Sequence, residues 1–386
     1  MLQKFQNTAL YLYFFSLSFE MFNLGGLGST SRFISILYLI AILPDIQSYL
    51  RIERISKYII PWIFLFTYIV IVSVVNLNQY TTWDHLFDTT IFFNILFYWF
   101  LINHERKVPN TLIKGFIAFI LSSITLTVFY YFGIGVEIEY GRIEIFGDNQ
   151  NKTGVRLAVA IISIIYLVFI SDFIKSKIKY LFLIPLPLML QFLFDTASRV
   201  AFVSLILSFA IMVLFNNSLK PSRKTVVIIL LGLFSVIYGK TLYLKSEVLA
   251  SRMSDIDEKG VTNSRDMVWD NALNIISSSP IFGVGKSGYV EKSILFSGRN
   301  MSPHNVILEV WALSGIIGLF VFSLFMYRII KASYTSFKID KFMLPMLLLI
   351  PVVGQILTGQ ILGHKLYWAI FALCVSSIFY LKQKRI

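Results

Sequence analysis

The residues with the clearest capacity for chemistry lie where a glycine-rich polar segment meets an apolar one, within residues 283–318. Ser302 suits a helix N-cap, and Pro303 suits the first helical position, where a missing N–H carries no penalty. The pattern therefore predicts that His304 and Asn305 lie in the first helical turn, at the positive end of the helix dipole. Such a site attracts anions and disfavours a second proton on histidine, so His304 could act as a general base. An ordinary histidine at a membrane interface is the alternative interpretation.

Arginines form a second group of candidates. Arg199 follows Asp195 in the sequence DTASR, which interrupts the apolar run 180–215 and predicts a tight turn between two helices. Arg199 is then either a ligand residue at the outer end of a helical bundle or the partner of Asp195 in an ion pair that closes the turn. Arg265 is expected to open a helix, where its charge opposes the helix dipole, and this favours a ligand role.

A group of cations on one membrane face suits a pyrophosphate, which guanidinium groups bind in bidentate fashion. Any one of these residues taken alone is more often a plain interfacial residue. The catalytic candidates are His304, Arg199 and Arg265, and the substrate-binding candidates are Arg142, Arg156, Arg299, Asn305 and Lys286.

Two short motifs resemble sites for other chemistry, but we interpret neither of them as such a site. The sequence GVGKS at 283–287 resembles the end of a P-loop, but the required first glycine falls at Pro280 and no strand precedes it. Asp255 and Asp257 resemble a metal-binding DxD motif, yet a solvated acidic patch is the preferred interpretation. Neither a nucleophile elbow nor a metal-ligand spacing is present in the sequence, so no metal and no cofactor are expected.

Composition sets the class of protein. The chain has 386 residues, of which 56% are hydrophobic and only 14% are charged, so it is expected to be a polytopic membrane protein. The net charge of +13 does not indicate nucleic-acid binding, because the basic residues fall mostly in short loops between apolar runs. The single cysteine, Cys374, excludes an internal disulfide.

The apolar runs predict an all-α polytopic membrane protein with about twelve transmembrane helices, since a span needs about 20 apolar residues. The expected spans are 7–24, 32–49, 58–76, 85–102, 111–132, 153–171, 180–196, 199–215, 225–240, 304–327, 342–359 and 366–381. Every loop expected inside carries lysine or arginine, which places both termini in the cytoplasm. The chain is expected to form one membrane domain, residues 1–386.

A large extracytoplasmic loop, residues 241–303, is expected between the ninth and tenth spans and should carry short helices. In it, Asn263 is expected to cap an amphipathic helix that stops before Pro280 and lies on the outer membrane surface. The glycines that follow are expected to form a flexible loop that shapes a cavity. The apolar stripe of the helix is predicted from Met267, Trp269, Leu273 and Ile276.

Four segments in this order resemble a known family. They are TASRVAF with Ser198 and Arg199, SRDMVWDNAL with Arg265, PIFGVGKSGY over 280–289, and HNVILEVWALSGIIGL over 304–319. Together they resemble the O-antigen polymerase and O-antigen ligase superfamily of bacterial membrane glycosyltransferases, the Wzy/WaaL type. The resemblance covers about residues 150–330, whereas the first 150 residues match only as apolar spans.

The resemblance implies a metal-independent transfer of a glycan from undecaprenyl pyrophosphate, at the outer face of the bacterial inner membrane. It implies that Arg199 and Arg265 hold the pyrophosphate and that His304 is the base. A polymerase extends another lipid-linked repeat, whereas a ligase uses a lipid A core, and no residue separates them; polymerase is preferred on general grounds. The expected partners are the lipid-linked glycan, the bilayer and a chain-length regulator, without nucleic acid. A lipid-glycan flippase or another transporter is the alternative of a different class.

Overall fold

The structure is a computed structural model that describes residues 1–386 except 24–28, 140–141, 216–220, 223, 226–231, 233–264 and 384–386. The chain divides into two units, each assembled from three separate stretches. Unit 1 comprises Met1–Ile46, Val108–Gly260 and Met343–Gly354, and unit 2 comprises Gln47–Lys107, Val261–Phe342 and Gln355–Ile386. This division concerns packing, and the expected single membrane domain stays a prediction.

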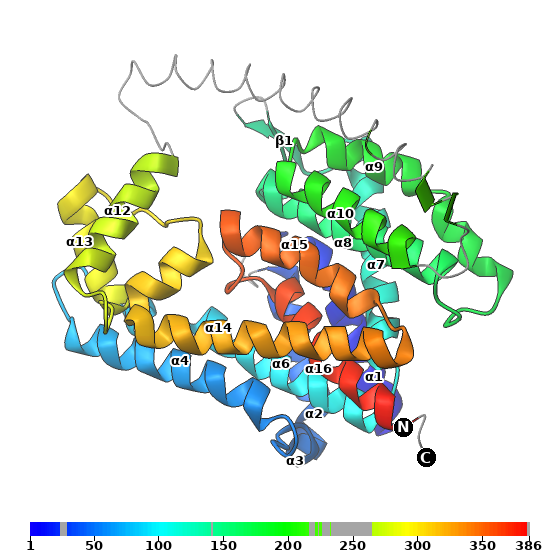
Figure 1. Ribbon diagram of the computed structural model, residues 1–386, viewed down its shortest axis with the longest axis horizontal. Coiled ribbons are helices and arrows are strands. Elements are labelled where there is room, and N and C mark those ends of the chain that lie inside the picture. Colours follow the sequence, from blue (N-terminus) through cyan, green and yellow to red (C-terminus); the bar gives the residue numbers. More distant parts are fainter. Residues whose placement is uncertain are drawn as a thin grey trace. The chain divides into compact units, whose positions relative to one another are not determined.

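Helix α8 lies at the centre of unit 1 (Figure 1). Its residues from Thr153 to Ile164 are all buried, so this part of the helix is covered on every side. Helices α7, α9 and α10 pack against it, and α1 packs against both α2 and α7. The helices of unit 1 are α1 Leu2–Ser16, α2 Thr30–Ile42, α7 Thr111–Tyr131, α8 Gln150–Phe169, α9 Leu186–Asp195 and α10 Arg199–Phe215.

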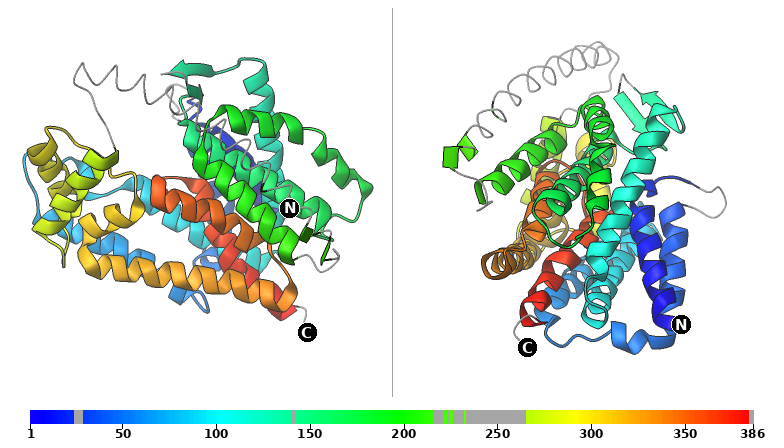
Figure 2. Two further views of the ribbon diagram at one scale, coloured as in Figure 1. Left: turned by 45° about the horizontal axis from the view of Figure 1, so that its top comes forward. Right: turned by 90° about the vertical axis from the view of Figure 1, so that its right-hand side faces the viewer.

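A two-stranded antiparallel hairpin precedes α8, and the sequence interpretation did not anticipate it (Figure 2). It consists of β1 Val136–Glu139 and β2 Arg142–Ile145. Its register pairs Val136 with Ile145 and Glu139 with Arg142. The signal was present in the sequence VEIEYGRIEI, where apolar and charged residues alternate on both sides of a Tyr-Gly turn.

Unit 2 is organised around the long helix α14, which packs along α4 and α16, while α16 also packs along α6 (Figure 1). Aromatic rings fill the space between these helices, with Trp62 4.7 Å from Trp368 and 5.1 Å from Phe325 between ring centroids. The helices are α4 Ser56–Val75, α5 Trp83–Leu86, α6 Thr89–Lys107, α12 Arg265–Ser278, α13 Gly285–Ser297, α14 Val306–Asp340 and α16 Lys365–Gln383. Helix α15, Leu344–Thr358, contains the boundary between the units.

The prediction of an all-α membrane protein is confirmed in its coarse form. Among the described residues, 6 helices are long and apolar enough to cross a membrane, and three shorter apolar helices accompany them. They are Thr30–Tyr49, Ser56–Val75, Thr111–Tyr131, Gln150–Phe169, Lys177–Asp195 and Val306–Asp340. Nearly all of the expected ninth span, 225–240, and the first part of the expected loop 241–303, residues 241–264 with Asn263, Asp255 and Asp257, fall outside the described residues. The twelve-span topology therefore stays a prediction.

Candidate functional site

His304 precedes helix α14 and does not lie in its first turn, in contrast to the prediction. The helix begins at Val306, and its N-cap is Asn305. The Asn305 side-chain oxygen accepts hydrogen bonds from the amides of Ile307 at 2.9 Å and Leu308 at 3.2 Å. Asparagine caps a helix as well as serine does, and here it lies directly before the apolar run that forms the helix. The cap therefore falls three residues later than expected from Ser302.

Ser302 and Pro303 lie in the connection that leads to this cap. The Ser302 hydroxyl accepts a hydrogen bond from the His304 amide at 3.4 Å and another from the side-chain amide of Gln360. His304 has a left-handed backbone with φ 46° and an exposed side chain. This conformation is uncommon for residues other than glycine, and backbone strain concentrates at functional sites. His304 thus remains near the positive end of the α14 dipole, with an accessible imidazole.

Helix α12 confirms the predicted helix but turns a different face inward. The exposed fractions of Met267, Trp269 and Leu273 are 41%, 36% and 47%, whereas Ile276 is 5% exposed. Three of the four residues of the predicted apolar stripe are thus exposed, and the contact of this stripe with the outer membrane surface stays a prediction. The buried face of α12 consists of Val268, Asn271, Ala272, Ile275 and Ile276, which recur at the helical spacing of three to four residues.

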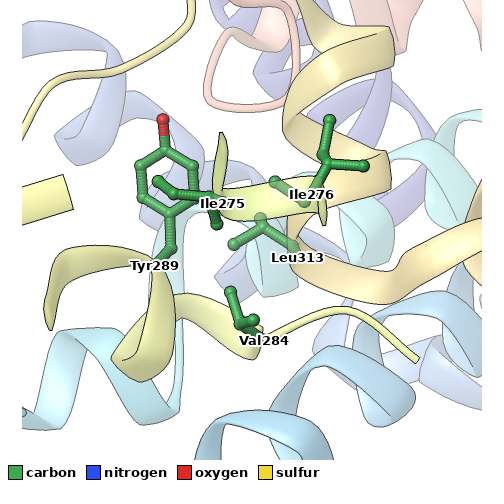
Figure 3. Packing of buried hydrophobic residues seen from close by; sticks show 6 residues of the cluster. Ile275, Ile276, Val284, Tyr289 and Leu313 are labelled. Carbon is green, nitrogen blue, oxygen red and sulfur yellow. The ribbon is translucent and has the colours of Figure 1, made fainter. Parts of the chain in front are cut away.

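The buried face of α12 joins a hydrophobic cluster that ties the glycine-rich segment to α14 (Figure 3). Ile275 and Ile276 from α12 meet Val284 and Tyr289 near the start of α13, and Leu313 from α14. Helix α13 begins at Gly285, so most of the glycine-rich segment is helical and the expected flexible loop is not formed. Burial, together with the nearby Glu309 carboxylate, raises the pKa of Tyr289 above its ordinary value. The phenol stays protonated and can donate to the Met301 carbonyl, 2.8 Å away.

Lys286 forms an ion pair with Asp88, and both side chains are partly buried. The other carboxylate oxygen of Asp88 accepts a hydrogen bond from the Ile91 amide at 3.0 Å, near the start of α6. Sequence interpretation missed Asp88, although a carboxylate inside an expected apolar span is a recognisable signal. The pair borders a mainly apolar cavity in unit 2 whose lining also includes Trp62, Phe66, Ile69, Val310 and Leu313. Because Asp88 neutralises the ammonium group, an anionic substrate would have to compete with it for Lys286.

Arg199 is the first residue of α10 and is exposed, directly after the turn that was predicted between two helices. Ala197 in this turn has a left-handed backbone, φ 51°. The Ser198 hydroxyl accepts from the Ala201 amide at 3.4 Å and so caps α10. The Asp195 carboxylate accepts hydrogen bonds from Tyr130 and Gln191, each 3.0 Å long. The sequence therefore located the turn, and the role of Arg199 stays a prediction.

Arg156 lies in a buried ionic cluster of unit 1. Its guanidinium contacts Glu20 at 3.0 Å and also pairs with Asp148, and all three side chains are at most 8% exposed. Removing one member of such a buried cluster lowers the free energy of unfolding by about 3–5 kcal/mol, because the remaining charge is left uncompensated. This geometry favours a structural role for Arg156, so its role in substrate binding stays a prediction.

The other cationic candidates lie at the ends of elements. Arg142 opens β2, where its Cα pairs with that of Glu139. Arg265 opens α12, as predicted. Arg299 is exposed and follows Gly298, which ends α13 with φ 75°.

The structure thus divides the candidates between the two units. Arg142, Arg156 and Arg199 belong to unit 1. Unit 2 holds Arg265, Lys286, Arg299, His304 and Asn305 on one continuous stretch that runs from α12 to the start of α14.

The family model described as O-antigen ligase, Wzy_C, matches residues 182–323. This range contains the turn before Arg199, helices α12 and α13, His304, and helix α14 as far as residue 323. A comparison with curated proteins gives no match. The family match supports an enzyme of the O-antigen ligase or polymerase type in a membrane. Over residues 182–323, the chain is therefore similar to the O-antigen polymerase and ligase superfamily, and this match supports the resemblance seen in the sequence.

Proposed function

We propose that this protein is a membrane glycosyltransferase that polymerises oligosaccharide repeat units carried on undecaprenyl pyrophosphate, at the outer face of the bacterial inner membrane. The observation that carries the proposal is the family match over residues 182–323, which contains Arg199, Arg265 and His304 in one ordered set. The exposed His304 directly before the N-cap of α14 is a second observation in its support, because the imidazole is accessible to a substrate there.

In the proposed reaction, a hydroxyl of the acceptor glycan attacks the anomeric carbon of the donor sugar. The new glycosidic bond forms as the bond from that carbon to the lipid pyrophosphate breaks. His304 accepts the hydroxyl proton, and the pyrophosphate leaves with the bonding electrons. Arg199 and Arg265 hold the pyrophosphate and compensate the charge that develops on it, so neither a metal nor a nucleotide is required.

Arg142, Arg299, Asn305 and Lys286 remain proposed contributors to substrate binding. Asn305 acts mainly through the helix cap, since its side-chain oxygen is already engaged by two amides. Lys286 contributes only where a substrate group displaces Asp88 from its ammonium. The position of the active site outside the cytoplasm, with both termini inside, follows from the basic loops of the sequence and is part of the proposal.

A ligase that transfers the finished glycan to a lipid A core is the second candidate. The matched family is described as O-antigen ligase, which specifically favours this candidate. Both candidates share the donor and the chemistry and differ only in the acceptor.

A deletion strain separates these functions when its surface glycans are resolved on a gel. Core that carries a single repeat indicates loss of a polymerase, which is the expected result. Naked core with polymer left on the carrier lipid indicates loss of a ligase and would replace the first proposal with the second. Unchanged glycans with altered solute uptake would contradict both and favour a transporter.

A further inference from the structure

Helix α14 is interrupted at Gly315, nine residues after it begins. Gly315 has φ 63° and ψ −168°, a backbone conformation that is essentially restricted to glycine. The interruption separates residues 306–314, which follow His304, from the remainder of α14. The direction of residues 306–314 is therefore not fixed by the helical hydrogen bonds of the rest of the helix.

Residues 280–285 occupy this interruption and replace the missing helical contacts. The Pro280 carbonyl accepts a hydrogen bond from the Ile316 amide at 3.0 Å and one from the Trp311 indole N–H at 3.1 Å. In the other direction, the Val284 amide donates to the Ala312 carbonyl at 2.9 Å. Backbone groups that the break would leave without partners are thus satisfied by a segment about thirty residues earlier in the chain.

Two glycines permit this close approach. A Cβ atom on Gly283 would lie 2.5 Å from the amide nitrogens of Ser314 and Gly315, and one on Gly315 would lie 2.0 Å from the Ile281 carbonyl oxygen. The opposing atoms belong to backbone, so a flexible side chain cannot make room by moving. Both positions therefore require glycine for contact as well as for conformation.

The same segment is held from its other side by α4. The Tyr68 hydroxyl donates to the Phe282 carbonyl at 3.1 Å, and the Lys286 amide donates to the Ser73 hydroxyl at 2.8 Å. A Cβ on Gly285 would lie 2.4 Å from the Ser73 amide nitrogen. Residues 280–285 are consequently fixed between two long apolar helices, α4 and α14.

We propose that residues 280–285 form a positioning element that sets the direction of residues 306–314 and, through them, the place of His304. Gly283 and Gly315 are positioning residues, since they act through the helix and not on the substrate. The catalytic consequence rests on the proposed function of His304, whereas the structural consequence does not.

The test compares Gly283→Ala with Gly298→Ala in the full-length purified protein. Gly298 also has a positive φ, 75°, but no atom lies within 4 Å of the added Cβ, so it controls for backbone strain alone. Trp311→Phe is a milder third variant, which removes the indole bond to Pro280 while keeping an aromatic ring. Turnover is measured with the lipid-linked glycan that accumulates in the deletion strain.

The expected result is a fall in kcat of about 10²-fold for Gly283→Ala with little change in the donor KM, because misplacement by about 1 Å suffices for such a loss. Gly298→Ala should stay within about twofold of the parent. Equal losses in both glycine variants, or a loss confined to KM, would overturn the proposal. If Gly283→Ala fails to fold, Trp311→Phe carries the test with a smaller loss in the same parameter.

A second readout does not depend on catalysis. A nitroxide is attached at position 304 by His304→Cys in a Cys374→Ser background, which contains no other cysteine. Gly283→Ala should increase the mobility of this label, and Gly298→Ala should not. An unchanged label in Gly283→Ala refutes positioning. If instead His304→Ala keeps full activity while the label responds as expected, the proposed role of His304 fails and the positioning element stands.

Discussion

Replacing Asn305 by alanine should loosen the start of α14. The substitution removes the side-chain oxygen that accepts from the Ile307 and Leu308 amides, and it also removes the amide N–H that donates to the Leu357 carbonyl at 3.3 Å. Loss of an asparagine cap lowers the stability of a helix by about 0.5–2 kcal/mol, typically about 1 kcal/mol. A cost of about 0.5–2 kcal/mol corresponds to about a 2–30-fold change in a local equilibrium. The amides of the first turn should therefore exchange with solvent faster by about that factor.

Hydrogen exchange followed by mass spectrometry on a peptide that spans the first turn of α14 measures this change directly. Asn305→Ser keeps an acceptor at the cap and should exchange at close to the parental rate. Ser302→Ala tests the correction to the predicted cap, because Ser302 does not contact the Ile307 amide, and it should leave the first turn protected. Slow exchange in Asn305→Ala combined with fast exchange in Ser302→Ala would refute the assignment of the cap.

Three further predictions concern other parts of the chain. Gly154→Ala should lower the free energy of unfolding by about 1–3 kcal/mol, because the new Cβ would lie 2.7 Å from the Ser198 Cβ; an unchanged melting temperature would argue against that contact. Asp88→Asn should destabilise the protein, and Asp88→Asn combined with Lys286→Met should recover much of the loss, which a double-mutant cycle measures; additive losses would mean that the pair is not coupled. Arg199→Ala should lower turnover of the lipid-linked donor by about 10²-fold without loss of protein from the membrane, and full activity in the purified variant would exclude it from pyrophosphate binding.

Local sequence signals predicted those elements that depend on local interactions. The apolar runs located the long helices, and the DTASR sequence located the turn before Arg199. Helix α12 was expected from its start near Arg265 to its end before Pro280, and it spans Arg265–Ser278. These features depend on hydrophobic periodicity, capping and proline, which act over a few residues.

Contacts between residues far apart in the sequence account for what the sequence could not show. Arg156 pairs with Glu20 across 136 residues, and no local pattern reveals that partner. Helix α13 forms in a glycine-rich segment because Val284 and Tyr289 pack into a shared cluster, so tertiary packing outweighs a weak helical propensity. The interruption at Gly315 was not anticipated, although a glycine inside an apolar helix is a recognised signal for close backbone approach.

The direct test of the central claim is the glycan ladder produced by His304→Ala in the deletion strain, with the amount of protein in the membrane measured in parallel. If His304 takes the acceptor proton, the variant should reach the membrane at parental levels and fail to restore glycan extension. A normal ladder at normal protein levels would contradict the assignment of His304 as the base.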